Sequence, residues 1–598
     1  MNQPAHASQP AQGRRPLRIG NASGFYGDRI AAFRDMIDGG PLDVVTGDYL
    51  AELTMLILWK AKKKDPSAGY ARTFLTQAQQ VLVDCVDRGI KIVVNAGGLN
   101  PAGLADEVRK VAADLGVDVR VAHVEGDDIL PRLAELQGRG HEFRHLDQGQ
   151  SLAESDADPV SANAYLGGWG IAAALEKGAD IVICPRVTDA SLVVGTAAWW
   201  HGWQRDEFDA LAGAVLAGHI IECGPQATGG NYSQIHEVTD RRYPGYPIAE
   251  VARDGSFAIT KHPGTGGLVS VGTVTAQILY EIDNPQYLNP DVVAHFDTAE
   301  IVQESESRVR VSGVKGSPPP TTLKVAMNYV GGYRNTMTMV LTGLDIEEKA
   351  AWATDELFEI LGGREAFDAT DIQLLRYDSP DPETAAQACA HLRITVKDRD
   401  RATVDRAFSN AVMELLLAGY AGAHTTTPPS SATEFGVYWP ALIDAVEVEH
   451  TVVHHDGSRT VIAPTPGVAA PRVEHAPAAD AAPGAAPTTR RPIGEIVAAR
   501  SGDKGGKANV GVWTDTPDRW DWLRSHLTVR RFVELVPEAA GLEIERHELA
   551  NLKALNFVIV GFLGDGVASS TRPDAQAKGL GEYLRARFTP IPNDLLPS

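Results

Sequence analysis

The chain has 598 residues, of which 44% are hydrophobic and 22% charged, an ordinary globular composition with enough apolar residues for a large core. Its formal net charge of -22 argues against nucleic acid as a partner, because phosphate binding requires clustered Lys and Arg. No apolar run reaches the roughly 18 residues of a membrane-spanning helix, so none is predicted.

The N-terminal sequence MNQPAHASQPAQGRRPLRIG has no apolar segment typical of a secretory signal. We interpret residues 1–16 as a disordered tail ahead of a first strand. The four cysteines, Cys85, Cys184, Cys223 and Cys389, are far apart and form no CxxC pair, so we expect neither a disulfide framework nor a cysteine metal site. These features favour a reduced, cytoplasmic protein.

From Leu17 to about Gly230, short apolar runs alternate with stretches of helical spacing. Strands are predicted at LRIG, LDVVTG, KIVV, VDVRVAHV and DIVICP, and helices at AELTMLILWKAKKK, ARTFLTQAQQVLVDCVDRG, LADEVRKVAADLG and SANAYLGGWGIAAALEKGA. In the last helix Ser161 is the expected N-cap. This alternation is typical of a parallel sheet covered by helices. We therefore predict a Rossmann-like α/β core over residues 17–290, with a mainly parallel sheet flanked by helices.

The pattern changes after about residue 250. ESRVRVSG and TTLKVAMNYVGGYRNTMTMVLTG alternate apolar and polar residues, as antiparallel strands do, and helices follow. We predict an α+β subdomain over residues 291–463. Residues 464–492 are dominated by Ala and Pro, which predicts a flexible or semi-extended linker. Residues 493–598 have the strand and helix order of a small α/β sandwich.

Polar side chains follow several predicted strands. In a parallel sheet the loops after the strands share one edge, which is where open α/β sheets bind ligands. Carboxylates beside an Arg can perform general acid–base catalysis when burial or a neighbour moves a pKa toward neutrality. Helix capping is the alternative for the acids that precede helices, Asp127, Asp128 and Asp189. The predicted catalytic residues are Asp48, Glu125, Asp127, Arg186 and Asp189.

The loop NAGGLNP, residues 95–101, joins a predicted strand to a predicted helix. Glycines allow backbone N–H groups to approach an anion, and the helix N-terminus adds partial positive charge. A tight turn in which Asn95 bonds its own backbone is the alternative. We predict that the polar and glycine residues of this loop, with one later asparagine, bind substrate: Asn95, Gly97, Gly98, Asn100 and Asn163.

A second glycine-rich loop, KHPGTGG, also precedes a predicted helix. A glycine nest beside a lysine suits a phosphate or a carboxylate, although the order is reversed from that of a Walker loop. A plain turn is the alternative. The substrate-binding candidates here are Lys261, Gly264, Thr265 and Gly266.

Three other features of the sequence are weaker signals. Cys223 lies in a polar glycine-rich loop, but a packed cysteine is favoured over a nucleophile, which would need a nearby His or helix N-terminus. Lys504 and Lys507 lie among glycines in ARSGDKGGKANVG, which could hold an anion, contact another subunit or be a solvated loop. No Cys/His cluster has metal-ligand spacing, so no metal is predicted.

Long motifs of the chain resemble one family. RIGNASGFYGDR, VTGDYLAELTM, NAGGLNP, SANAYLGGWGIAAALEKGADIVICPRVTDASLV, GHIIECGPQATGGN and KHPGTGGLVSVGTVTAQILYEI are similar to segments of the acyclic terpene utilisation family, the AtuA-like proteins. The similarity covers roughly residues 17–450. ARSGDKGGKANVG and LNFVIVGFLGDGVASS resemble the ferredoxin-fold module often fused to this family, which implies a C-terminal ferredoxin-like α+β domain.

The resemblance implies a role in degrading acyclic terpenoids of the citronellol and geraniol type, through branched acyl-CoA thioesters. It carries over no catalytic residue, so the predicted site depends on the convergence of the loops. Our leading hypothesis is a lyase or hydratase acting on a branched acyl-CoA or its acid. A carboxylate would act as base, and Arg186 or Lys261 would hold a carboxylate or an enolate. No cofactor is predicted, and a CoA thioester would enter as substrate.

Two alternatives stay open. A non-catalytic partner or scaffold of the pathway's acyl-CoA carboxylase or other enzymes would explain the linker and the separate terminal domain. A nicotinamide-dependent oxidoreductase is less favoured, because GxGxxG is absent. Polar glycine-rich loops often lie at subunit contacts, so we expect a homo-oligomer. The expected partner is a small molecule, without nucleic acid or membrane.

Overall fold

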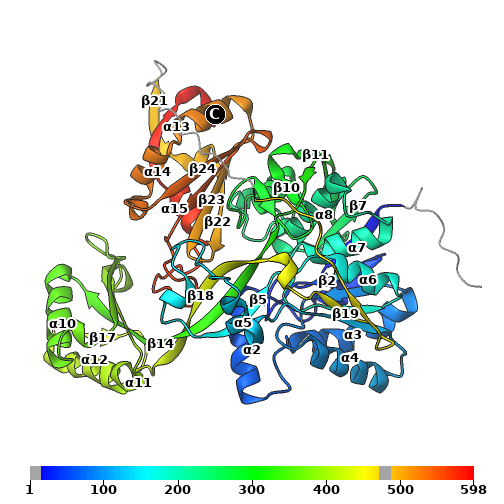
Figure 1. Cartoon of the computed structure of the whole chain (residues 1–598). Helices are drawn as coiled ribbons and strands as arrows, with labels where there is room; N and C mark the ends of the chain where they lie inside the picture. The colour runs from blue at the N-terminus through cyan, green and yellow to red at the C-terminus, as the bar shows by residue number, and fades with distance from the viewer. Residues whose placement is uncertain (1–14, 471–486, 598) are drawn as a thin grey trace, which may run out of the picture. The chain divides into compact units, whose positions relative to one another are not determined.

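The computed structural model describes residues 15–470 and 487–597 (Figure 1). The predicted tail over 1–16 lies almost wholly outside these residues, and so does most of the predicted linker over 464–492. Within the described residues the chain forms two compact units. The predicted subdomain over 291–463 is divided between them. The ranges of the larger unit are Met1–Asn328, Tyr438–Val567 and Gln576–Ser598, and those of the smaller unit are Tyr329–Val437 and Ala568–Ala575.

An 11-stranded sheet forms the body of the larger unit. At its centre five parallel strands lie in the order β1 (Leu17–Asn21), β2 (Val44–Gly47), β3 (Lys91–Val94), β6 (Ile181–Ile183) and β4 (Val121–Glu125). Antiparallel strands extend both edges. They are β7 (Pro247–Val251), β8 (Phe257–Lys261), β12 (Arg308–Ser312) and β11 (Glu300–Ser305) beside β1, and β19 (Thr451–Val453) and β20 (Arg459–Val461) beside β4. The prediction of a mainly parallel sheet is therefore not confirmed, because hairpins from distant parts of the chain complete a mixed sheet.

Helices cover both faces of the parallel centre. On one face α1 (Ala32–Asp38), α3 (Thr73–Arg88) and α4 (Pro101–Leu115) pack together over side chains of β2, β3 and β6. On the other face lie α6 (Trp169–Glu176), α7 (Ser191–His201) and α8 (Phe208–Ile221). α3 shows why such segments are helical: Phe74, Gln77, Ala78, Val81, Leu82 and Cys85 recur at three- and four-residue spacing and are buried. Glycine in the left-handed conformation ends it at Gly89.

One predicted helix is partly wrong. Residues Pro159–Ala164 form strand β5, which pairs with β14 (Thr322–Thr342), and the helix begins only at Trp169. Ser161 is therefore a buried strand residue and not an N-cap. Pairing with a strand more than a hundred residues away outweighed the local preference of an alanine-rich segment.

Three further helices belong to the body. They are α2 (Glu52–Lys64), α5 (Leu133–Gly138) and α9 (Val271–Ile278). A small antiparallel sheet joins β9 (Gln286–Leu288), β10 (Val293–His295) and β13 (Lys315–Ser317). In the described part of the chain no helix combines the length and the apolar character needed to span a bilayer.

Apart from the segment 568–575, the C-terminal domain belongs to the larger unit, and it has its own core. Its antiparallel sheet has the order β22 (Ala498–Lys504), β23 (Lys507–Trp513), β25 (Ala554–Ile559) and β24 (Ile544–Leu549). The helices are α13 (Pro517–His526), α14 (Val529–Leu535) and α15 (Leu580–Arg585), and a short ribbon pairs β21 (Thr488–Pro492) with β26 (Phe588–Pro592). β22 and β23 form a hairpin whose two-residue turn separates Lys504 from Lys507.

The smaller unit is an antiparallel sheet with helices packed against it. Its strands are β15 (Ala369–Arg376), β16 (Cys389–Asp398), β14 and β17 (His424–Thr425), and β18 (Thr433–Asp444) pairs with β14. The helices α10 (Ile346–Ile360), α11 (Arg401–Val404) and α12 (Arg406–Ala418) contribute to its core. Arg393 and Lys397 of β16 donate hydrogen bonds to the carbonyl oxygens of Thr571 and Ser569, which ties the segment 568–575 to this unit.

Candidate functional site

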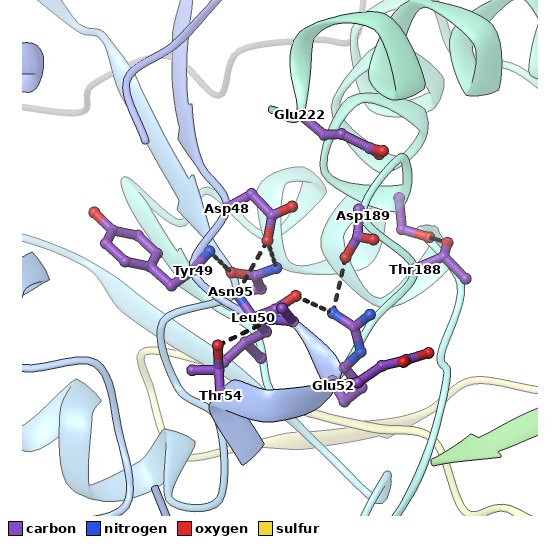
Figure 2. Close-up of polar contacts among 12 residues, drawn as sticks. Asp48, Tyr49, Leu50, Glu52, Thr54, Asn95, Thr188, Asp189 and Glu222 are labelled. Carbon is purple, nitrogen blue, oxygen red and sulfur yellow. Dashed lines mark hydrogen bonds and ion pairs between the residues drawn. The ribbon is translucent and has the colours of Figure 1, made fainter. Parts of the chain in front are cut away.

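Asp48 lies at the carboxyl end of β2, buried inside the protein. Asn95, which follows the neighbouring strand β3, donates a hydrogen bond from Nδ2 to Asp48 Oδ1 at 2.5 Å. The other end of the same amide accepts from the backbone N–H of Tyr49 at 2.7 Å (Figure 2). Because β2 and β3 are parallel neighbours, the two residues meet at one sheet edge, and Asn95 fixes the orientation of the Asp48 carboxyl group.

Arg186 and Asp189 come from the loop after β6, the next strand in the sheet. The guanidinium of Arg186 is buried; its Nη1 donates to Asp189 Oδ1 at 2.8 Å and to the Leu50 carbonyl oxygen at 2.7 Å. Its carbon Cζ lies 4.2 Å from the centre of the Tyr165 ring, a cation–π contact. Asp189 does not cap α7, whose N-cap is Ala190. The capping alternative for Asp189 is thus wrong, and the residue serves as the partner of a buried arginine.

A third carboxyl group, Glu222, enters from the end of α8. Figure 2 shows the side chains of Asp48, Asp189 and Glu222 gathered around one space. Burial raises the pKa of Asp48 well above its ordinary value, and the charges of Asp189 and Glu222 raise it further, while Arg186 and Asn95 oppose the shift. Burial also raises the pKa of Glu222, with Asp189 and Glu281 adding to it. The site therefore places two buried carboxyl groups with raised pKa beside Asp189, which is ion-paired with Arg186.

A cavity of about 250 Å³ adjoins this cluster. Asp189 and Thr188 line it from the body, together with Lys324 of β14 and the rings of Tyr165, Tyr287 and Tyr438. The hairpin of the C-terminal domain supplies Lys504, Gly505 and Lys507, and an apolar part of the wall comes from Leu146, Leu288, Leu323, Leu442, Pro290 and Pro320. Concave sites with a mostly apolar lining and a few convergent polar groups are where small ligands bind.

Two other predicted catalytic residues do not line this cavity. Glu125, at the end of β4, accepts from Arg459 Nη2 at 2.8 Å and lies 2.9 Å from His123 Nε2. Asp127 is buried behind Arg186: its Oδ2 accepts from Asn163 Nδ2 at 2.7 Å and from the backbone N–H of Arg186 at 3.1 Å. Burial, assisted by the charge of Asp128, raises the pKa of Asp127 to about 7. Asp127 and Asn163 thus support the loop that carries Arg186.

The loop 95–101 bonds to protein groups on every side. Asn100 caps α4 through Gly103 N at 3.0 Å, and its Nδ2 donates to the carbonyl oxygen of Ser67. A Cβ atom on Gly97 would lie 2.6 Å from the Cys184 carbonyl oxygen, and one on Gly98, whose φ is +49°, would lie 2.3 Å from Leu58 Cδ1. The glycines allow close packing of the chain. Substrate binding by these residues stays a prediction.

The second glycine loop lines a different hollow. Lys261 Nζ donates to the Thr265 carbonyl oxygen at 2.6 Å, and Gly264, Thr265 and Gly266 line a surface hollow of about 610 Å³ together with Arg29, Asp35 and Tyr243. None of these residues is among those that line the cavity beside Asp189. The second predicted substrate-binding loop therefore lies at a different hollow from the cavity beside Asp189.

Several residues at the cavity or close to it were not predicted from the sequence. The sequence pattern did not indicate a role for Glu222, Glu281, Lys324, Tyr165 or Tyr438. For Lys504, anion binding was only one of three interpretations of its glycine-rich segment. Glu222 carried one usable signal, since it directly follows α8, a helix in which most residues are apolar. Burial raises the pKa of the adjacent Cys223 well above its ordinary value, which favours the packed cysteine over a thiolate nucleophile. Across residues 15–470 and 487–597 no group of His, Cys, Asp and Glu is placed to hold a metal ion.

Within the larger unit, fold and site together define a mixed α/β body and a small C-terminal domain that jointly line a cavity with apolar walls and a few polar groups. The model of the family described as acyclic terpene utilisation family protein AtuA matches residues 17–454, and that of the AtuA ferredoxin-like domain matches residues 491–588. The chain belongs to the acyclic terpene utilisation family, as its motifs indicated, and this membership implies involvement in acyclic terpene use. No curated protein and no solved structure matches it significantly.

Proposed function

We propose that the protein is an enzyme of the lyase or hydratase type that acts on a branched acyl-CoA or the corresponding acid. The observation that carries this proposal is the cluster of Asp48, Asp189 and Glu222 around buried Arg186, beside a cavity of about 250 Å³. Family membership supplies the context, because the use of acyclic terpenes requires reactions on branched carbon chains.

The proposed chemistry follows from the different surroundings of these carboxyl groups. Asp48 and Glu222 are buried acids with raised pKa, whereas Asp189 is ion-paired with Arg186 and lines the cavity. A protonated carboxyl beside a carboxylate provides a general acid and a general base in one place. In a hydration, the carboxylate would take a proton from water as the water oxygen bonds to carbon, and the carboxyl would deliver a proton to the adjacent carbon. The lyase direction reverses both transfers.

The size of the cavity bears on the form of the substrate. Pockets for drug-sized ligands occupy about 300–1,000 Å³. A cavity of about 250 Å³ suits a small branched acid, or the acyl part of a thioester whose nucleotide part stays outside. Arg186 would stabilise negative charge on the reacting group, since its guanidinium is desolvated and held by Asp189 and the Leu50 carbonyl oxygen.

The test is turnover of a panel of branched enoyl-CoA and hydroxyacyl-CoA thioesters and their free acids by the full chain, followed by mass spectrometry. Asp189→Asn is expected to lower kcat by about 10²- to 10⁴-fold, the usual contribution of a general acid or base. Asp189→Glu, which keeps the charge, should retain more activity. Thermal unfolding of both variants separates a chemical effect from a folding defect, because Asp189→Asn leaves a buried arginine unpaired.

The matched control is Asp106→Asn. Asp106 forms the same kind of ion pair, three residues from Arg109 at 2.7 Å, but on the exposed surface of α4. Its loss should leave turnover unchanged. If no thioester or acid is turned over, the enzymatic proposal fails; stable co-purification of pathway enzymes would then favour a non-catalytic role.

A further inference from the structure

Three lysines line the cavity, and they differ in what they bind. Lys324 Nζ lies 3.3 Å from Glu52 Oε1. Lys507 Nζ lies 3.3 Å from Asp147 Oδ1 and 3.7 Å from Asp283 Oδ1. Both ammonium groups therefore have carboxylates of the protein as partners.

Lys504 has a neutral partner instead. Its Nζ donates to the backbone carbonyl oxygen of Glu281 at 2.9 Å and lies 5.1 Å from the centre of the Tyr287 ring. Within the described residues it has no carboxylate oxygen within 4.0 Å. An ammonium group has three donors, and a carbonyl oxygen uses one of them. Lys504 thus places a positive charge at the cavity wall, and two of its N–H donors are available to a ligand.

The hairpin holds Lys504 in place through contacts with the body. Asn509 of β23 accepts from the backbone N–H of Glu281 at 2.9 Å and donates to the Leu279 carbonyl oxygen at 2.7 Å. Asn556 of β25 donates to the Ile282 carbonyl oxygen at 3.1 Å. Both asparagines are buried. The C-terminal sheet is therefore anchored to the chain just ahead of the cavity-lining segment 283–290, and the position of Lys504 is set before any ligand arrives.

The wall of the cavity also has an extended apolar part. Leu288, Leu323 and Leu442 line it with Pro290 and Pro320. A ligand that satisfies both parts of this wall has an anionic group and a hydrocarbon portion. A planar carboxylate fits the cationic part, because charge-assisted hydrogen bonds to an ammonium group are stronger than those to a neutral donor.

We propose that Lys504 of the C-terminal domain binds the carboxylate of a small branched-chain acid whose hydrocarbon portion lies against Leu288, Leu323 and Leu442. The inference rests on the proposed function and specifies its substrate: the acid carries a free carboxylate, and the site is incomplete without the C-terminal domain. Lys504 is a binding residue, while proton transfer stays with the carboxyl groups near Arg186.

The competing explanation is that Lys504 only balances the buried acids. Its charge lowers the pKa of both Glu222 and Glu281, so such a role would be physically sensible. The two explanations differ in ligand selectivity. A charge-balancing lysine affects acids and neutral analogues alike, whereas a carboxylate-binding lysine favours the acid.

The experiment is calorimetric titration of the full chain with branched-chain alkanoates of increasing length and with their matched primary amides. We expect the acid to bind more tightly than its amide. Lys504→Gln should weaken acid binding by about 10- to 100-fold, the effect of losing a hydrogen bond to a charged group, and should leave the amide nearly unchanged. Lys504→Arg should keep the preference for the acid. Lys507→Gln, which removes a paired charge from the same wall, should weaken acid binding less.

Two results would overturn the assignment: equal losses for acid and amide in Lys504→Gln, or no binding of any acid by the unmodified chain. Thermal unfolding of Lys504→Gln shows whether the variant is folded. If it is not folded, the preference of Lys504→Arg for the acid over the amide is the test. Turnover is not measured in this experiment. A chain that binds acids through Lys504 but converts neither thioesters nor acids would retain the assignment and lose the proposed reaction. A chain that converts them without this preference for the acid would lose the assignment and retain the reaction.

Discussion

Two glycine-containing turns of this molecule differ in what their polar side chains bind. The loop 95–101 follows a parallel strand and precedes a helix, the arrangement from which anion binding is usually inferred. Its amides nevertheless bond to Asp48, Tyr49 and Ser67. The hairpin turn between Lys504 and Lys507 precedes no helix, yet it presents two ammonium groups to the cavity.

The difference shows that a glycine in a turn indicates close approach to the backbone. It does not indicate whether the approaching group belongs to the protein or to a ligand. In the loop 95–101, the groups that come close are Leu58 and the Cys184 carbonyl oxygen. In the hairpin, Gly505 has a φ of +62° and Gly506 packs against the Gly564 carbonyl oxygen, which leaves the flanking lysines free to face the cavity. The first turn supports a catalytic candidate, and the second lines the place for a ligand.

The largest stability effect should come from Asn95→Leu. This change removes the donor to Asp48 and the acceptor of the Tyr49 N–H, both in a buried setting, so the free energy of unfolding should fall by about 2–4 kcal/mol. Chemical denaturation followed by circular dichroism measures it. Lys504→Gln should cost less, because Lys504 is partly exposed at the cavity. An equal loss of unfolding free energy in the two variants would contradict the prediction that the loop 95–101 supports the fold while the hairpin faces a ligand.

Gly98→Ala should have the next largest effect, a loss of about 2–3 kcal/mol that combines left-handed strain with a clash against Leu58. The matched control is Gly116→Ala, since Gly116 has a φ of +71° and open space where its Cβ would lie. That variant should lose only the conformational part, about 1–2 kcal/mol. The difference between the two denaturation midpoints isolates the packing of the loop. No difference would mean that Gly98 is kept for its backbone conformation alone.

The smallest effect concerns the pH dependence of stability. Burial raises the pKa of Glu281 to about 7 from its ordinary value of 4.5, and Lys504 opposes that shift. The folded chain therefore keeps this proton after the unfolded chain has released it, so stability falls as pH rises from about 4.5 to about 7. Without Lys504 the pKa of Glu281 should rise further. The fall should then continue above pH 7, by up to about 1.4 kcal/mol per pH unit.

Thermal unfolding of Lys504→Gln across this pH range measures the effect against the unmodified chain. Adding Glu281→Gln to the variant removes the titrating group and should abolish the additional fall. If the fall persists in the double variant, another acid near Lys504, such as Glu222, is responsible, and the hairpin acts on a different carboxyl group than the structure indicates.

Much of the body could be predicted from local pattern. The apolar spacing of α3, the start of α4 after Asn100 and its end at Gly116 are all visible in the chain. The convergence of Asp48 and Arg186 was also predictable, because both follow parallel strands. β5 was not, since its strand conformation depends on pairing with β14. ESRVRVSG was predicted as an antiparallel strand and contains β12, but its place in the large sheet depends on pairing with β8 and could not be read from the sequence.

The sequence by itself determined the family, the order of the elements and the group of polar loops at one sheet edge, because periodicity and loop position are local properties of the chain. Only the tertiary structure decided which of those loops has side chains at the cavity. Asn95 and Lys261 bond to protein groups, Glu125 pairs with Arg459, and Asp189 reaches the cavity. Hydrogen-bond partners and charge neighbours come from residues hundreds of positions apart, as when Lys504 meets Glu281. Burial and neighbouring charge set the proton affinities on which the proposed chemistry depends, and both exist only after the chain has folded.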